Sequence, residues 1–302
     1  MDQKKLIEEI KSFDRAVSAM TANGHFRMAA IRNTNTVKTA QMQHELSHIP
    51  AYYLAKHLTS AQLMASFLKG EERIIIETET NGLIQKLYSE AIQVGEARGY
   101  VDYDEKLLTG KVGSEKDILG IGLLKVQKIL YNKSEPFTGV VELQFSDIAA
   151  DMAYYYHKSE QIPTAVIIDA DFDDKGILTN SGGLILQAMP DAGKEEIDMM
   201  MKALEDSSKL MEYFRDNQTP DKIMKDIFPV DIKILKSIRL DFFCRCSKES
   251  FMQKLIALGQ DELKDMQEKG NNELVCRYCN KKYTLDDNDF ESLFVELNSM
   301  NN

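Results

Sequence analysis

The stretch RIIIETETNGLIQKLYSEA, residues 73–91, decides the fold class of the chain. It consists of two strand-like runs on either side of the dipeptide Asn81-Gly82. Asn-Gly between two such runs is a strong signal of a β-hairpin. The sequence therefore predicts two antiparallel strands, at residues 73–80 and 83–91.

Further strand-like runs follow, and helical segments lie before and among them. The predicted strands are residues 97–103, 123–130, 138–144, 164–172 and 183–190. Residues 37–69 are predicted to be helical with an interruption near Pro50, and residues 146–160 form a second predicted helix. This order favours an α+β fold, in which helices cover a largely antiparallel sheet, over a doubly wound parallel sheet.

The length of 302 residues is more than one hydrophobic core accommodates comfortably. Composition changes after Pro190, where a polar, methionine-bearing helical pattern begins that Pro220 and Pro229 cut into short pieces. We therefore predict three parts, which are an α+β core at 1–190, a helical linker at 191–240 and a small zinc-binding domain at 241–302.

The predicted linker admits two interpretations. It is either a helical connector lying on the core or a conditionally folded segment whose apolar residues become available when its support is lost. Its methionines fit an adaptable surface, because unbranched thioethers repack easily, but they fit simple core filling as well. They are Met199, Met200, Met201, Met211 and Met224.

Charge and hydropathy bear on the partners and the compartment. No run approaches the roughly 18 apolar residues that cross a bilayer, and residues 1–16 lack the apolar centre of a secretion signal. We therefore predict a cytoplasmic protein without a membrane partner. The formal net charge of -11 argues against sequence-independent binding of nucleic acid, which requires Lys and Arg to neutralise phosphates.

Three short motifs suggest enzymatic chemistry, and each lacks part of its pattern. HELSH, from His44 to His48, matches a zinc-protease motif, but Pro50 follows closely and no third histidine lies ten residues beyond His44. Residues 120–122, GIG, precede a strand rather than a helix, so a dinucleotide site is not expected. The pair Gly110-Lys111 is followed by valine instead of the hydroxyl of a P-loop. We predict neither a nucleotide site nor an enzyme.

All four cysteines of the chain lie in two short stretches, FFCRCSKES at 242–250 and VCRYCNKKY at 275–283. The resulting CxC and CxxC pairs are separated by 29 residues that read as short helices with a turn at Gly270. Four thiolates complete a tetrahedral Zn²⁺ shell with no position open for catalysis. The predicted zinc ligands are Cys244, Cys246, Cys276 and Cys279.

Zinc-bound thiolates can also be oxidised, and each of these cysteines has a near neighbour with which it can form a disulfide. Bridges within each pair would not tie the two stretches together, whereas the metal does. Structural zinc contributes on the order of 10–16 kcal/mol to the folding of small modules, so a module of about 60 residues would unfold without it. Bridges between the two stretches would instead preserve the connection.

The cysteine stretches resemble the zinc region of the redox-regulated 33 kDa heat-shock chaperone family, also called the 33 kDa chaperonin. The resemblance continues upstream through SFDRAVSA, EARGYV, YYYHKSEQIPTAV and NSGGLILQAMPDA, in the order of that family. It covers nearly the whole chain, and all four ligand positions match.

The resemblance implies a cytoplasmic, ATP-independent holdase that is inactive while reduced and zinc-bound. It implies disulfides within the Cys244/Cys246 and Cys276/Cys279 pairs, zinc release, and unfolding of the zinc domain with the adjacent linker. The activated form would bind unfolding client proteins and dimerise. Residues 191–240 would be the sensing linker, and the core would be the platform on which it rests.

Two alternatives remain open. A zinc-stabilised interaction protein without a redox switch would have the same ligands. A zinc-ribbon nucleic-acid binder would use the basic residues near the cysteines, which are Arg245, Lys248, Arg277, Lys281 and Lys282. Residues 241–302 nevertheless hold 8 basic and 12 acidic residues, a net of -4, which is unlike a phosphate-binding module.

Overall fold

The computed structural model describes residues 13–106, 115–131, 133–205 and 208–300. The predictions for the N-terminal residues 1–12 and for Gly110-Lys111 lie outside these ranges. The chain divides into two compact units, Met1–Phe243 and Cys244–Asn302.

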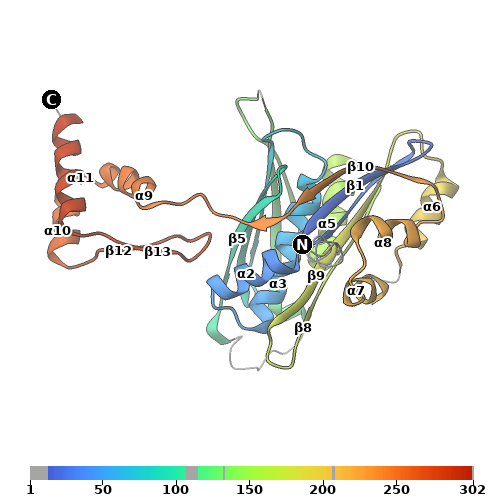
Figure 1. The fold of residues 1–302 in the computed structure, drawn as a ribbon, viewed down its shortest axis with the longest axis horizontal. Helices are drawn as coiled ribbons and strands as arrows, with labels where there is room; N and C mark the ends of the chain where they lie inside the picture. The colour runs from blue at the N-terminus through green and yellow to red at the C-terminus, as the bar shows by residue number, and fades with distance from the viewer. Residues whose placement is uncertain (1–12, 107–114, 132, 206–207, 301–302) are drawn as a thin grey trace, which may run out of the picture. The chain divides into compact units, whose positions relative to one another are not determined.

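The strands of the first unit form two sheets (Figure 1). The five-stranded sheet has the order β10-β1-β2-β9-β8, and all its neighbours are antiparallel. Its strands are β1 (Arg15–Thr21), β2 (Phe26–Arg32), β8 (Thr164–Phe172), β9 (Leu178–Ala188) and β10 (Ile232–Arg239).

The six-stranded sheet has the order β11-β5-β4-β3-β6-β7. Its strands are β3 (Arg73–Thr80), β4 (Ile84–Ile92), β5 (Glu96–Tyr103), β6 (Gly122–Ile129), β7 (Phe137–Glu142) and β11 (Asp241–Phe242). Among the described strands only the two-residue pairing of β11 with β5 is parallel. The predicted α+β class with largely antiparallel pairing is therefore confirmed.

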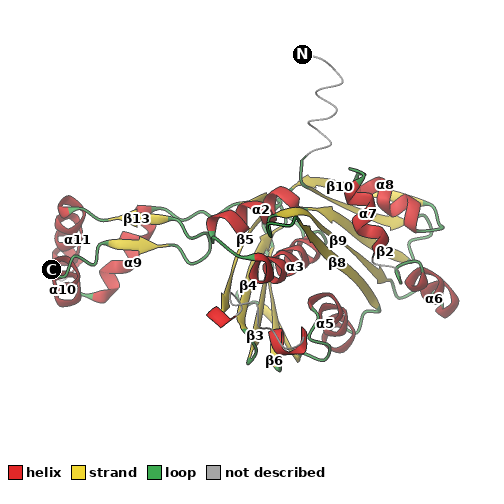
Figure 2. Ribbon diagram, turned by 90° about the horizontal axis from the view of Figure 1, so that it is seen from below, coloured by secondary structure: helices red, strands yellow, loops and turns green. Residues whose placement is uncertain are grey.

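The helices of the first unit pack inside and outside the sheets. They are α2 (Thr34–Gln43), α3 (His48–Ala65), α4 (Glu115–Leu119), α5 (Ile148–Tyr155), α6 (Lys194–Lys202), α7 (Ser208–Arg215) and α8 (Pro220–Ile227), with a π-helical turn, η2 (Tyr156–Glu160). Helix α3 contacts β3, β4 and β5 of one sheet and β2, β8 and β9 of the other (Figure 2). Fifteen of its residues are buried, as expected of a helix that packs on all sides.

The predicted interruption in residues 37–69 falls earlier than Pro50. Helix α2 ends at Gln43 and α3 begins at His48, and Glu45 between them has a left-handed φ of 52°. Pro50 lies in the first turn of α3, where the missing N–H has no intrahelical partner to lose. The break therefore comes from the connecting turn and not from the proline.

The predicted hairpin at residues 73–91 is confirmed, but its turn is not a tight Asn-Gly turn. Neither Asn81 nor Gly82 has a positive φ. Asn81 instead accepts a hydrogen bond from the Ile121 N–H through Oδ1 at 2.8 Å. A Cβ on Gly82 would lie 2.5 Å from the Ile118 carbonyl oxygen, so glycine is required for the close approach of two chain segments.

The outer face of the five-stranded sheet is covered by α6, α7 and α8 (Figure 2). Met200, Met211 and Met224 are buried in this second core, whereas Met199 is 43% exposed. At the three buried positions, methionine therefore fills the core. The ring of Phe214, fully buried, packs over the backbone of Gly182, where a Cβ would lie 2.5 Å from the ring.

The prediction that residues 191–240 are helical throughout is wrong for its last part. Residues 232–239 form strand β10, which pairs with β1 from Arg15↔Arg239 to Thr21↔Ile232. A partner more than 200 residues away in sequence overrides local pattern here. The segment as a whole belongs to the first compact unit, which extends to Phe243.

The second unit is a small helical module with one hairpin. Its elements are α9 (Lys248–Leu255), a 3₁₀ turn η3 (Ile256–Leu258), α10 (Gln260–Glu268), β12 (Glu273–Val275), β13 (Lys282–Thr284) and α11 (Asp287–Met300). The predicted short helices and the turn at Gly270, with a φ of 68°, are confirmed. Its buried apolar core consists of Leu263, Leu285, Phe290, Leu293 and Leu297.

Within the part of the chain that the structure describes, the search for a membrane-spanning helix is negative. Each helix is either too short or too polar to cross a bilayer.

Candidate metal centre

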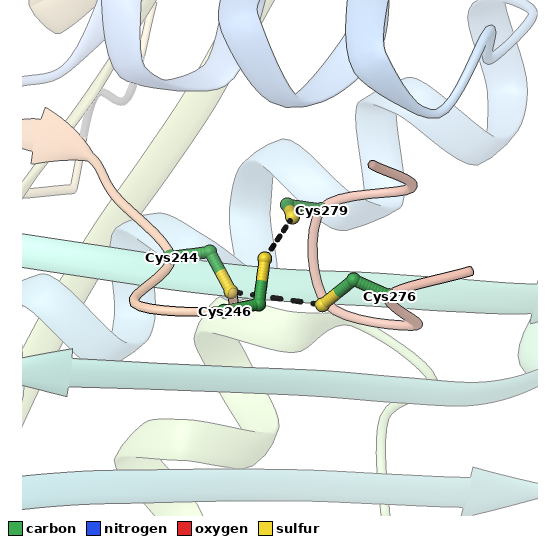
Figure 3. A group of neighbouring side chains, drawn as sticks. All are labelled: Cys244, Cys246, Cys276 and Cys279. Carbon is green, nitrogen blue, oxygen red and sulfur yellow. Dashed lines mark hydrogen bonds between the residues drawn. The ribbon is translucent and has the colours of Figure 1, made fainter. Parts of the chain in front are cut away.

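The second cysteine pair lies in the turn between β12 and β13. The Cys276 N–H donates to the Lys281 carbonyl at 2.8 Å, and the Asn280 N–H donates to the Cys276 carbonyl at 2.7 Å. Asn280 adopts a left-handed φ of 56°, which asparagine tolerates better than most residues. This compact turn brings the sulfurs of Cys276 and Cys279 toward the first pair (Figure 3).

The first cysteine pair lies in an extended segment that leads into α9. Ser247 is the N-cap of α9, and its side chain accepts a hydrogen bond from the Ser250 N–H at 3.2 Å. The Ser250 hydroxyl in turn accepts a hydrogen bond from the Ser247 N–H. This reciprocal capping fixes the point at which the chain leaves Cys246 and enters the helix.

The structure brings the four cysteines together, as the sequence predicts. All four Sγ atoms lie within 4.8 Å of one another. Two distances across the pairs are short, at 3.7 Å for Cys244–Cys276 and 3.4 Å for Cys246–Cys279. Sulfurs bound tetrahedrally at about 2.3 Å from an ion stand roughly 3.8 Å apart. The cluster therefore has the composition and the size of a four-cysteine metal site.

The thiols differ in their electrostatic environment. Burial raises the pKa of Cys276 and of Cys279 above the usual value for a thiol. Partial burial also opposes ionisation of Cys246, but hydrogen bonds from Tyr283 and the neighbouring thiols lower its pKa overall. Four thiolates in this space repel one another, so a bound cation would provide the positive charge that keeps them deprotonated.

Tyr283 is a site residue that the sequence analysis missed. Its hydroxyl donates to the Cys246 carbonyl at 2.9 Å and lies 3.3 Å from Cys246 Sγ. Its ring packs 5.7 Å from the ring of Phe251 in α9. Tyr283 therefore links the hairpin to the first cysteine pair and to the following helix. An aromatic residue directly after the CxxC stretch was the available signal.

The HELSH motif does not form a metal site. His44 is the C-cap of α2, and His48 is the first residue of α3, so the two histidines do not share one helix. His48 instead packs its ring against Phe172 at 4.6 Å. Gly122 begins strand β6, which agrees with the prediction that no helix follows the GIG motif. Among the described residues, the cysteine cluster alone brings at least three metal-ligating groups together.

Several of the basic residues near the cysteines contact neighbours in the same module. Lys248 forms an ion pair with Asp289, and Lys282 pairs with Glu273 at 3.2 Å. The ammonium of Lys281 lies 5.1 Å from the centre of the Tyr283 ring. These contacts give the three lysines structural roles within the module.

The fold and the site define a protein with a helix-filled pair of antiparallel sheets and a four-cysteine C-terminal module. A family model described as Hsp33 protein matches residues 14–286. The chain therefore belongs to the Hsp33 family of chaperones.

Individual relatives span nearly the whole chain. It is 33% identical over 289 residues to the 33 kDa chaperonin of Desulforamulus reducens, covering 94% of this chain and 98% of that protein. It is 30% identical to the 33 kDa chaperonin of Bacillus subtilis, with 93% and 98% covered. The crystal structure of the 33 kDa chaperonin of Thermotoga maritima superposes with a TM-score of 0.84 at 26% identity, covering 95% and 99%.

Proposed function

We propose that the protein is a redox-regulated, ATP-independent holdase that binds unfolding client proteins and prevents their aggregation under oxidative stress. In the resting form Cys244, Cys246, Cys276 and Cys279 hold a zinc ion, and the chaperone is inactive. Oxidation forms disulfides, releases the metal and unfolds the C-terminal module together with residues 191–240, which act as the sensing linker. The activated protein dimerises.

One observation carries this proposal, which is the position of the four sulfurs in a module with little other cohesion. The buried apolar core of the second unit consists of five side chains. Four Sγ atoms within 4.8 Å join two segments that are about 30 residues apart in sequence. When bound there, zinc would cross-link the segments and make the folded module depend on the redox state of the sulfurs.

The redox chemistry needs an external two-electron oxidant for each pair. Two thiols transfer two electrons and two protons to one hydrogen peroxide, which becomes two water molecules, and one S–S bond forms. Cys244 and Cys246 are half-buried, so they are more accessible to the oxidant than Cys276 and Cys279. A disulfide within each pair removes the thiolates that bind the ion and leaves the two segments unconnected.

A second candidate is a zinc-stabilised interaction protein without a switch. The short sulfur distances run between the pairs, from Cys244 to Cys276 and from Cys246 to Cys279. Disulfides formed along these contacts would keep the two segments joined after the metal leaves. The module would then remain folded, and oxidation would expose no binding surface.

We place the protein in the cytoplasm and propose no enzymatic activity and no nucleotide, nucleic-acid or membrane partner. A holdase needs no nucleotide, because burying apolar surface of the client provides the free energy of binding. The acidic net charge of -11 supports the absence of a nucleic-acid partner.

The test combines three measurements on the zinc-loaded protein during mild peroxide treatment at raised temperature. A chromogenic chelator follows zinc release, light scattering follows the aggregation of a thermally unfolding enzyme, and peptide mapping locates the disulfides. The proposal predicts zinc release, suppression of aggregation, and bridges within the pairs. Zinc release without suppression of aggregation, or bridges between the pairs, would favour the second candidate.

A further inference from the structure

Residues 231–243, which we call the strap, connect the edges of the two sheets in the first unit. Strand β10 is the edge strand beside β1, and β11 is the edge strand beside β5. Between them, the Leu240 N–H donates to the Asp14 carbonyl at 3.0 Å, and the Leu240 side chain is buried in the main core. The strap ends immediately before Cys244, so it is the part of the first unit that is adjacent in sequence to the cysteine cluster.

The strap is held mainly through its backbone. No side chain of β10 is fully buried, whereas five of the seven side chains of β1 are buried. Leu235 is 55% exposed. Beyond the seven-residue register with β1, the Ala22 N–H donates to the Asp231 carbonyl at 2.9 Å. A strand bound in this way can be exchanged for another, because main-chain hydrogen bonds are independent of sequence.

We propose that the β1 edge is a binding site for extended segments of unfolding polypeptides, which add to the sheet as a strand after the strap has left. The inference rests on the proposed function, because it assigns that function a surface and a mode of binding. A vacated β1 would present unpaired N–H and C=O groups beside an apolar face, which is a template for strand pairing. Such recognition suits a chaperone that must bind clients of varied sequence.

The resident strap indicates which client segments fit best. Its inner side chains Ile232, Ile234 and Ile238 are half-buried and alternate with exposed residues over part of the strand. The exposed positions include three cations, Lys233, Lys236 and Arg239, while the strand has no acidic residue. The whole chain has a net charge of -11. We therefore expect extended segments with spaced apolar residues and basic side chains to bind more tightly than acidic ones.

Gly95 provides a way to displace the strap without altering a cysteine. It has a φ of +102°, and a Cβ at this position would lie 1.9 Å from the Arg239 carbonyl oxygen. The Asp241 N–H also donates to the Gly95 carbonyl at 3.1 Å. Alanine at this position would therefore collide with the strap backbone. Gly70→Ala is the matched control, because Gly70 also has a positive φ, +55°, but nothing lies within 4 Å of its Cβ position.

The experiment measures binding of a fluorescent peptide, DIKILKSIRLDF, to the reduced and zinc-loaded full-length protein. The peptide has the sequence of residues 231–242. Gly95→Ala should bind it roughly tenfold more tightly than the wild type or Gly70→Ala, because the competing strap is displaced. N-methylation of alternate peptide amides, on the hydrogen-bonding edge, should abolish the binding. Equal binding of the methylated peptide would overturn strand addition, as would equal affinities of Gly95→Ala and Gly70→Ala.

Hydrogen exchange on the wild type covers the case in which Gly95→Ala does not fold. After zinc is chelated, the amides of β1 should lose protection and regain it when the peptide is added. Protection of β1 that persists while the cysteine module exchanges freely would overturn the proposal. Neither readout uses an aggregation assay. A protein that binds the peptide but does not suppress aggregation would therefore contradict the proposed holdase function while leaving the edge site intact.

Discussion

The two units of this chain differ in what keeps them folded. In the first unit, α3 is buried between two sheets, and a second apolar core lies under α6, α7 and α8. In the second unit, five buried apolar side chains and four clustered sulfurs provide the cohesion. The comparison teaches that one chain can combine a core stabilised by apolar burial with a module whose stability is available for regulation through its metal ligands.

Removing a sulfur should give the largest effect. Cys279→Ser is expected to abolish zinc binding and to unfold the second unit, with a loss on the order of 10 kcal/mol of apparent folding free energy. The first unit should keep its fold. Zinc stoichiometry and limited proteolysis check both statements, with Ser292→Ala, an exposed change in the same module, as the control. A compact module in Cys279→Ser would show that the apolar core is sufficient.

Phe214→Ala tests the contribution of apolar burial to the first unit. The ring is fully buried against Gly182, so its removal should cost about 3–5 kcal/mol. Urea unfolding should show the loss, and zinc content should not change. Phe137→Ala is the matched control, because Phe137 is 56% exposed and surface changes stay within about 0.5 kcal/mol. Equal effects of the two substitutions would contradict the assigned packing of α7.

Acidification should weaken the first unit through His57. This side chain is completely buried, with Nδ1 2.8 Å from Ser89 Oγ and Nε2 3.1 Å from Thr78 Oγ1. Burial lowers the pKa of His57 to about 3, compared with about 6.5 in an unfolded chain. Between these values the unfolded chain binds a proton that the folded chain does not, so stability is present above pH 6.5 and is lost as the pH falls.

The measurement is urea unfolding at pH 7 and pH 4.5 for the wild type and for His57→Gln. The wild type should lose roughly 3 kcal/mol more than the variant over this range. Parallel pH dependences for the two proteins would mean that His57 accepts its proton in the folded state.

Tyr283→Phe should give the smallest effect. It removes the hydroxyl that donates to the Cys246 carbonyl, a contribution of about 1 kcal/mol. The ring and its contact with Phe251 would remain. Zinc transfer to a competing chelator should become a few times faster without a change in stoichiometry. Phe294→Leu, which alters the partly buried periphery of the same core, provides the control for a general loosening of the module.

The sequence was most informative where the decisive pattern is local. The Asn81-Gly82 hairpin and the clustering of Cys244 with Cys279 both follow from short stretches. Strand β10 could not be assigned in this way, because β1, which selects its conformation, lies at the other end of the first unit. Tyr283 was missed for a related reason, since its role depends on Cys246 across the cluster.

The break between α2 and α3 shows the same limit at short range. Proline indicated a nearby interruption, but a left-handed residue, Glu45, makes the turn. Glutamate has no special preference for this conformation. The surrounding packing therefore imposes a backbone geometry that the residue type does not announce.

Hydrogen exchange on the full-length protein, with and without a zinc chelator under reducing conditions, tests the central claim most directly. The account predicts that residues 244–300 lose protection when the metal is removed, whereas α3 remains protected between its two sheets. Persistent protection of β12, β13 and α11 in the metal-free protein would contradict the claim that the four cysteines hold this module together through a metal.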